Sequence, residues 1–259
     1  MDTISIGKHN PRLVDIRKAI DHGRLTSDRL LPVEGPKLVK EAVTSGIEIV
    51  ALFLREGVDF VEVPRGVTTY VVEPAVFKGI QSTEHSQGVI ALVRQREWKL
   101  SDVLAGAPSP IAVLVGLQDP GNVGTILRVA ESFGAAGCLG VAGTASVHNS
   151  KVVRASAGSI FRVPHVWDLE WHDVVSSMKS GGFELIGTSP HAAESILSWD
   201  WNRPAAVLIG NEGAGLTAEQ AAACTTVLQI PQKAPVESLN SAIAASVILY
   251  ESYRRRNPS

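Results

Sequence analysis

The feature that most constrains the fold is a repeated alternation of short apolar runs with amphipathic segments between residues 111 and 255. The apolar runs read IAVLVGL, CLGVA, FELIGT, AAVLIG and TVLQI. Apolar residues at helical spacing follow in 122–134, from Asp173 onward, in 217–223 and in 238–255. Near-continuous apolar strands that alternate with such helices indicate a mostly parallel sheet covered on both faces. The sequence therefore predicts an α/β fold for this region.

A smaller α/β/α sandwich is predicted upstream, with a domain boundary near residue 105. The segment SDVLAGAPSP interrupts the apolar periodicity with small residues and prolines, so we expect domains at 1–105 and 106–259. A helix should begin at Asn10 and Pro11 and stop near Gly23. Further upstream elements are a helix within 34–46, the strands IEIVALFL, TTYVV and GVIALV, and a short helix from Pro74 to Ile80.

Composition excludes several classes of protein. The 259 residues carry 24 Lys+Arg against 26 Asp+Glu, so RNA contacts would have to come from local patches. No apolar run approaches the roughly 18 to 20 residues that cross a bilayer, and MDTISIGKHNPR lacks a signal-peptide core. Cys138 and Cys224 are too far apart for a CxxC pair, and the histidines form no metal motif. We expect a soluble cytoplasmic protein without a metal.

Three stretches place polar residues and glycines directly after a predicted strand, where open parallel sheets bind ligands. In the first, LQDPGNVGTILRVAESFG, Asp119 begins a turn, Asn122 is the expected N-cap and Arg128 follows on the helix. The guanidinium of Arg128 could hold a phosphate or carboxylate near the positive end of the helix. Taken without the other two stretches, this one is better explained by an ordinary capped helix with a surface arginine.

The second stretch is VLIGNEGAGLT, in which three glycines would let the backbone approach a ligand closely. Asn211 and Glu212 add polar groups at the strand end. The spacing GNEGAG does not match the dinucleotide pattern GxGxxG, and no suitable ribose-binding acid follows. For the glycines alone, a purely structural turn is an equal alternative.

The third stretch, LQIPQKAPVESLNSAIAASVILYE, has a strand end at Ile230 and then opens a long alanine-rich helix. Ser238 could simply cap that helix. Asn240 in the first turn is harder to explain by propensity, because asparagine favours caps and turns over helix interiors. Its amide is therefore expected to face a site.

Together, NVGTILR, IGNEGAGL and IPQKAPVESLNSAIAASV resemble the signature motifs of the SpoU (TrmH-like) branch of the SPOUT RNA methyltransferases, in family order. KVVRASAGSIFRVP, between the first two motifs, resembles a stretch that many members carry. The resemblance covers residues 111–254. Residues 30–94, with VEGPKLVKEAV and STEHSQGVIALV, resemble the N-terminal substrate-binding domain of rRNA-modifying members.

The resemblance implies transfer of a methyl group from S-adenosyl-L-methionine to a ribose 2′-hydroxyl of RNA, with large-subunit rRNA as substrate. It implies a deep C-terminal trefoil knot, a rare exception to unknotted chains, and a homodimer whose sites are completed across the interface. Residue by residue, it implies catalytic positions at Asn122, Arg128, Glu212, Ser238 and Asn240, cofactor positions at Gly210, Ile230 and Leu239, and RNA contacts at Glu34 and Lys37.

The resemblance also suggests individual roles. Arg128 matches the residue proposed to activate the 2′-hydroxyl, but a guanidinium is strongly basic and does not readily release a proton. We therefore expect Arg128 to grip the adjacent phosphate and stabilise the developing alkoxide. Asn122 and Asn240 would orient ribose and cofactor, and Glu212 would hold Arg128 or the backbone of an opposing subunit. The open alternatives are a tRNA substrate, a non-catalytic RNA-binding protein and, against the glycine spacing, a nucleotide-dependent oxidoreductase.

Overall fold

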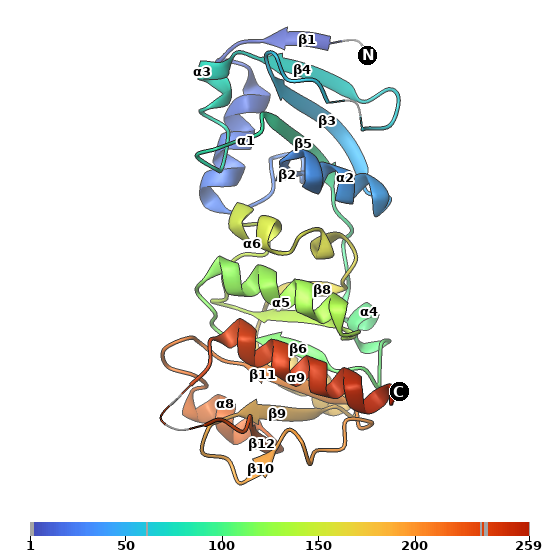
Figure 1. The fold of residues 1–259 in the computed structure, drawn as a ribbon, viewed down its shortest axis with the longest axis vertical. Coiled ribbons are helices and arrows are strands. Elements are labelled where there is room, and N and C mark those ends of the chain that lie inside the picture. The colour runs from blue at the N-terminus through green and yellow to red at the C-terminus, as the bar shows by residue number, and fades with distance from the viewer. Residues whose placement is uncertain (1–2, 61, 234, 236–237, 259) are drawn as a thin grey trace. The chain divides into compact units, whose positions relative to one another are not determined.

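The computed structural model describes residues 3–60, 62–233, 235 and 238–258. The chain forms two compact units, which we describe separately (Figure 1). Unit 1 comprises Met1–Glu97 and Ser146–Arg162, and unit 2 comprises Trp98–Ala145 and Val163–Ser259. The boundary expected near residue 105 thus falls inside unit 2, and the chain enters unit 1 a second time at Ser146. Residues 146–162 are too few to form a core of their own, and such a core is what usually marks a domain in a sequence.

Unit 1 contains a five-stranded mixed sheet in the order β1-β4-β3-β5-β2. β1, β4 and β3 run parallel, whereas β5 is antiparallel to β3 and β2. The strands are β1 (Thr3–Ile6), β2 (Leu31–Glu34), β3 (Glu48–Arg55), β4 (Thr68–Val72) and β5 (Val89–Arg94). The helices are α1 (Pro11–His22), α2 (Pro36–Thr44), α3 (Pro74–Phe77) and α6 (Ser150–Ala155), followed by a 3₁₀ turn over Ser159–Phe161.

Helices cover both faces of this sheet, as the sequence predicts. Helix α1 begins where Asn10 accepts a hydrogen bond from Arg12 N at 3.0 Å and ends at Gly23 with a φ of 59°. Side chains of α1 and α3 pack in one cluster with Phe53 of β3 and Ile90 of β5. Residues of β3 that alternate with Phe53 are also buried, and α2 contacts β2, β3 and β5.

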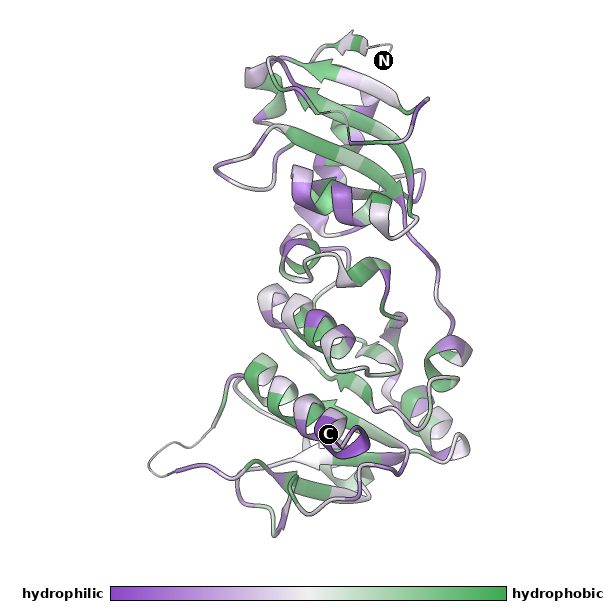
Figure 2. Cartoon of the chain, turned by 45° about the vertical axis from the view of Figure 1, so that its right-hand side comes forward, coloured by the Kyte–Doolittle hydropathy of each residue, from purple (hydrophilic) through white to green (hydrophobic). Residues whose placement is uncertain are grey.

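Unit 2 contains a seven-stranded sheet in the order β10-β12-β9-β11-β6-β7-β8, in which every pair is parallel. The strands are β6 (Ile111–Leu114), β7 (Gly137–Val141), β8 (His165–Leu169), β9 (Glu184–Thr188), β10 (Glu194–Ser195), β11 (Ala205–Ile209) and β12 (Thr226–Gln229). In Figure 2 the strands of this sheet are mostly hydrophobic, as expected for strands buried on both faces. The predicted parallel α/β fold is confirmed.

Five helices of the described chain complete unit 2: α4 (Leu100–Leu104), α5 (Pro120–Ser132), α7 (Trp171–Ser180), α8 (Ala218–Ala223) and α9 (Ser241–Arg256). Residues of α4 and α7 pack with Ile111 and Val113 of β6 on one face of the sheet. The alternate residues Ala112 and Leu114 are also buried, and α5 contacts β6 and β7. Helix α9 lies beside α5 (Figure 1), so the last helix returns to the first motif.

Four strands of the structure were not expected from the sequence, namely β1, β2, β8 and β10. They are the edge strands of the two sheets. Edge strands are short and less evenly apolar than central ones, so they lack the run that marks a buried strand. Helix α4 also lies where the sequence indicated a linker. Among the described residues, no helix is long and apolar enough to cross a membrane.

Candidate functional site

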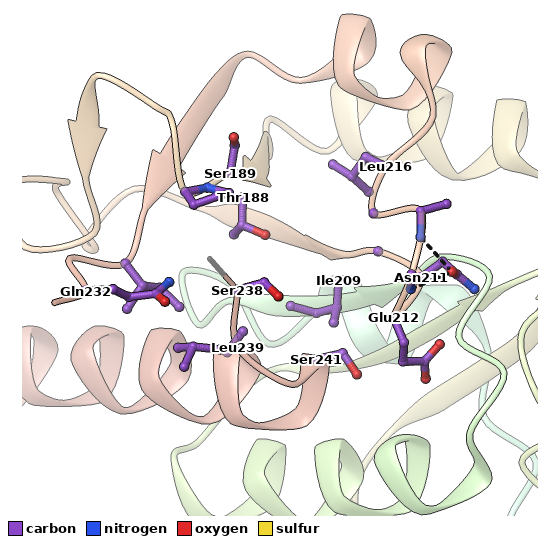
Figure 3. Close-up of a pocket in the computed structure, with 17 residues that line it drawn as sticks. Thr188, Ser189, Ile209, Asn211, Glu212, Leu216, Gln232, Ser238, Leu239 and Ser241 are labelled. Carbon is purple, nitrogen blue, oxygen red and sulfur yellow. Dashed lines mark hydrogen bonds between the residues drawn. The ribbon is translucent and has the colours of Figure 1, made fainter. Parts of the chain in front are cut away.

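A pocket of about 300 Å³ lies at the carboxyl ends of β9, β11 and β12 (Figure 3). Such an edge of a parallel sheet is the usual ligand position in α/β folds. The loops after all three strands and the start of α9 contribute to its wall. Its lining includes Thr188, Ser189, Pro190, Ile209, Gly210, Asn211, Glu212, Gly213, Ala214, Gly215, Leu216, Ile230, Gln232, Ser238, Leu239, Ser241 and Ala244.

The loop after β11 is a tight turn that only glycine permits at two points. A side chain at Gly210 would place its Cβ 2.7 Å from the carbonyl carbon of Gly215 and 2.8 Å from its oxygen. Gly215 itself has a φ of 66°, in the left-handed region. Asn211 and Gly215 exchange backbone hydrogen bonds of 3.1 and 3.0 Å across the turn. These two glycines are therefore required by the pocket wall.

Asn122 lies at the centre of a chain of side-chain hydrogen bonds. Its Oδ1 accepts from Asn240 Nδ2 at 3.0 Å, and its Nδ2 donates to Glu212 Oε1 at 3.1 Å. The expected N-cap role of Asn122 is wrong, because Asp119 caps α5 by accepting from Gly121 N at 2.9 Å. Asn122 is thereby free to join the first motif to the other two.

Glu212 holds the second motif against the turn that precedes α5. Its carboxylate also accepts from Gln118 N and Asp119 N, at 3.2 Å each. Partial burial raises the pKa of Glu212, whereas the hydrogen bonds from Asn122 and these backbone groups lower it. The hydrogen bonds have the larger combined effect, so the pKa of Glu212 is below its ordinary value. An ionised carboxylate is the form that accepts all these bonds.

Asn240 performs two tasks at once. Its Oδ1 caps α9 by accepting from Ala242 N at 2.9 Å and Ile243 N at 3.2 Å, while its Nδ2 reaches Asn122. The sequence suggested Ser238 as a cap, whereas the cap of α9 is Asn240. The sequence placed Asn240 inside the first turn, where asparagine is disfavoured, but Asn240 is the N-cap, where asparagine is favoured. Residues 234, 236 and 237 of the third motif lie outside the described residues.

Arg128 does not join this group in the described chain. Asn122 is buried, whereas Arg128 is exposed six residues later, about 120° around the helix. The predicted contact between Glu212 and Arg128 is absent, because Glu212 bonds to Asn122 and to the preceding turn of its own chain. Arg128 is therefore exposed and makes no contact with Glu212 in the described chain.

Three residues with expected cofactor roles, Gly210, Ile230 and Leu239, line the pocket, as do Glu212 and Ser238. Ser241 was not anticipated. It is 8% exposed, and its Oγ has no hydrogen-bond partner among the described residues. A hydroxyl without a partner is costly to bury, which favours a ligand contact. Thr188 and Ser189 were also missed, although Thr188 ends the predicted strand FELIGT and Ser189 directly follows it, which is the same signal that marked the other loops.

In unit 1, the two residues with expected RNA contacts differ in accessibility. The Glu34 carboxylate accepts from Ser82 N at 2.7 Å, from Thr83 Oγ1 at 2.9 Å and from Ser82 Oγ. Arg154 of α6 donates to Ser82 Oγ at 2.5 Å. Glu34 therefore fixes the loop after α3, while Lys37 is exposed at the start of α2. Among the described residues there is no cluster of three potential metal ligands.

Comparison of this sequence with known protein families identifies the class of protein to which the fold and the pocket belong. Residues 109–250 match the SpoU rRNA Methylase family, and residues 17–91 match the MRM3-like substrate binding domain. The chain therefore belongs to the SpoU rRNA methylase family, as its three motifs predicted.

Individual relatives agree with this assignment. An uncharacterized tRNA/rRNA methyltransferase of Synechocystis is 36% identical over 74% of this chain and 69% of its own. The 23S rRNA (guanosine(2553)-2′-O)-methyltransferase RlmP of Bacillus subtilis is 27% identical over 93% of this chain and 95% of its own. The crystal structure of an AdoMet-bound rRNA methyltransferase from Sinorhizobium meliloti superposes with a TM-score of 0.82 at 29% identity, covering 99% of both chains.

Proposed function

We propose that this protein transfers a methyl group from S-adenosylmethionine to a ribose 2′-hydroxyl of large-subunit rRNA. The observation that carries the proposal is the convergence of three separated motifs, in which Asn240, Asn122 and Glu212 form one hydrogen-bonded chain beside the pocket. Family membership and the AdoMet-bound and rRNA-modifying relatives support the donor and the substrate. The cytoplasm is the proposed location.

The pocket fits the cofactor. Ile209, Leu216, Ile230 and Leu239 give it apolar walls suited to an adenine, and Gly210 lets the loop after β11 close tightly against Gly215. The unpartnered Ser241 hydroxyl offers a polar contact. S-adenosylmethionine supplies an electrophilic methyl group on a sulfonium, and Gly210, Ile230 and Leu239 are the residues proposed to hold it.

The remaining residues of the site position the acceptor. Asn122 and Asn240 are fixed by one another, and Glu212 fixes Asn122, so these side chains need no reorganisation when RNA binds. Ser238 adds a small donor and acceptor. Alignment of the hydroxyl with the methyl group, together with stabilisation of the developing alkoxide by Arg128, would supply most of the acceleration.

The exposure of Arg128 supports a homodimer in which each arginine serves the site of its partner. Helix α9 also exposes Ile243 (53%), Tyr250 (50%) and Tyr253 (42%), and Phe133 packs against both tyrosines. Large apolar side chains gathered on one helix mark a surface that a second copy can cover. We infer that two chains pair through this surface.

The C-terminal knot is part of the same proposal. β11 lies between β9 and β6, β12 lies beyond β9, and α9 then returns to pack beside α5. This path, with the loops of the second and third motifs bounding the pocket, supports threading of the end of the chain. Unit 1 would form the RNA-binding domain and unit 2 the methyltransferase domain, in place of the expected division at residue 105.

The function is tested by transfer of labelled methyl from S-adenosylmethionine to purified rRNA and tRNA, followed by mapping of 2′-O-methyl positions. We expect a single modified rRNA position and no modified tRNA. Label in tRNA alone would favour the tRNA alternative, and RNA binding without transfer would favour a non-catalytic protein. Calorimetric binding of NAD in place of S-adenosylmethionine would reverse the assignment to an oxidoreductase.

The role of Arg128 is tested by substitution and by mixing subunits. Arg128→Lys should lose most of its activity, because an ammonium cannot replace the guanidinium fork; activity near the wild-type rate would contradict this role. Arg128→Ala and Asn122→Ala should each be inactive, yet regain activity when refolded together, because one site of the mixed dimer is then intact. No recovery would mean that Arg128 acts within its own chain.

A further inference from the structure

The pocket wall depends on one asparagine that the motif analysis did not assign to the site. Asn211 Oδ1 accepts from Gly213 N and Ala214 N, at 3.0 Å each, and so sets the tip of the loop after β11. Its Nδ2 donates to Gly116 O at 2.8 Å, beyond the end of β6. The shape of this wall and its attachment to the neighbouring strand thus rest on the same side chain.

Gly116 is in turn fixed by a residue outside the pocket. Gly116 N donates to Thr144 Oγ1 at 3.1 Å, and Thr144 Oγ1 donates to Leu114 O at 3.0 Å. Thr144 follows β7 and is 7% exposed. Its hydroxyl therefore pairs two backbone groups where β6 ends and the ladder hydrogen bonds stop.

We use the name crossbar for the group of Asn211, Gly116 and Thr144. The crossbar joins the carboxyl ends of β11, β6 and β7. We propose that Thr144 is a positioning residue for the S-adenosylmethionine pocket, acting through Gly116 and Asn211. The proposal rests on the proposed function, because it takes this pocket as the cofactor site. Preorganised loops bind more tightly because less freedom is lost on binding.

Thr144→Val removes the hydroxyl at nearly constant volume and leaves the Gly116 N–H without its acceptor. Loss of a buried hydrogen bond of this kind should weaken binding of S-adenosylmethionine about tenfold. The rate at saturating cofactor should change by less than about twofold, because loop order affects binding before the chemical step. Thr144→Ser, which keeps the hydroxyl, should restore binding.

A matched control is available in unit 1. Thr26 is 6% exposed and accepts from Leu30 N at 3.0 Å through its hydroxyl. Thr26→Val removes a comparable buried hydrogen bond, so it should lower the melting temperature without changing the affinity for S-adenosylmethionine. This comparison separates pocket positioning from general stability.

The experiment is calorimetric titration of each variant with S-adenosylmethionine, combined with amide hydrogen exchange of the cofactor-free protein. We expect faster exchange at Gly213 and Ala214 in Thr144→Val and not in Thr26→Val. Equal affinity of wild type and Thr144→Val, or unchanged exchange, would overturn the proposal. Failure of the wild type to bind S-adenosylmethionine would instead overturn the proposed function.

A second variant keeps the test decisive if Thr144→Val folds poorly. Asn211→Asp keeps the Oδ1 acceptor but replaces the donor to Gly116 O with a carboxylate oxygen, so it should weaken binding as well. Residues that act through one connection give non-additive effects, and Thr144→Val should therefore add little to Asn211→Asp. Additive losses would show that Thr144 acts independently of Asn211, against the proposal.

Discussion

At the scale of single residues, the site is made of side chains that each satisfy several partners. Asn240 caps a helix and bonds to Asn122, and Glu212 accepts from one side chain and two backbone groups. Their residue types drew attention to them in the sequence, because Glu212 and Asn122 are polar groups beside buried apolar runs and Asn240 opens a long alanine-rich helix. Their partners could not be predicted, since each partner lies about 90 residues or more away.

Gly210 and Gly213, two of the three glycines that line the pocket, make a matched pair for one prediction. Gly210→Ala places a methyl group 2.7 Å from the Gly215 backbone, so the turn must open and S-adenosylmethionine should bind at least about tenfold more weakly. At Gly213 the nearest atom to a Cβ is Asn211 Oδ1 at 3.7 Å, so Gly213→Ala should bind normally. Equilibrium dialysis would decide, and equal affinities would contradict the steric argument.

At the scale of elements, the start of α9 has two roles: Asn240 caps the helix and also bonds to Asn122 in the site. The sequence correctly indicated a long helix in this region but not its N-cap. Propensity allows Ser238 or Asn240 as the cap, and the choice depends on packing of α9 beside α5, which brings Asn240 to Asn122. In the same way, the N-cap of α5 is Asp119, whereas the sequence predicted Asn122.

Substitution of Asn240 should separate its role as the helix cap from its role in the site. Asn240→Ala should lower the free energy of unfolding by about 1 kcal/mol and abolish most methyl transfer. Asn240→Asp keeps the capping oxygen and adds a favourable charge at the helix start, so stability should return while activity stays low. The carboxylate cannot donate to Asn122 Oδ1. Chemical denaturation and single-turnover assays measure the two effects.

Asn10 provides the control, because it caps α1 in unit 1 through the same side-chain bond. Asn10→Ala should lose a comparable amount of stability without a change in the single-turnover rate. Wild-type activity in Asn240→Asp would mean that the bond between Asn240 and Asn122 is dispensable.

At the scale of the whole molecule, stability should depend on pH through a buried histidine. His165 begins β8, is 5% exposed, and bonds through Nδ1 to Val163 O at 2.8 Å, which makes Nδ1 the donor. Burial lowers the pKa of His165, although the bond to Val163 opposes this. The unfolded chain therefore binds a proton more readily than the folded protein as the pH falls below the ordinary histidine value of 6.5.

The contribution of His165 to stability should be complete above this pH and be lost progressively on acidification. His165→Gln cannot titrate, so the free energy of unfolding should fall less between pH 7 and pH 5 than in the wild type. Urea unfolding of the wild type and His165→Gln at several pH values tests this, and equal slopes for the two proteins would exclude His165.

The sequence by itself determined the α/β class, the central strands, the loops after β11 and β12 that line the pocket, and the first motif, whose Asn122 bonds to both of them. Local periodicity and residue type carry that information, because a buried strand must be apolar and a close turn must contain glycine. Tertiary structure alone decided the edge strands, the return of 146–162 to unit 1, the caps at Asp119 and Asn240, and the crossbar through Thr144. These features depend on hydrogen bonds and packing between residues distant in sequence, which no local pattern records.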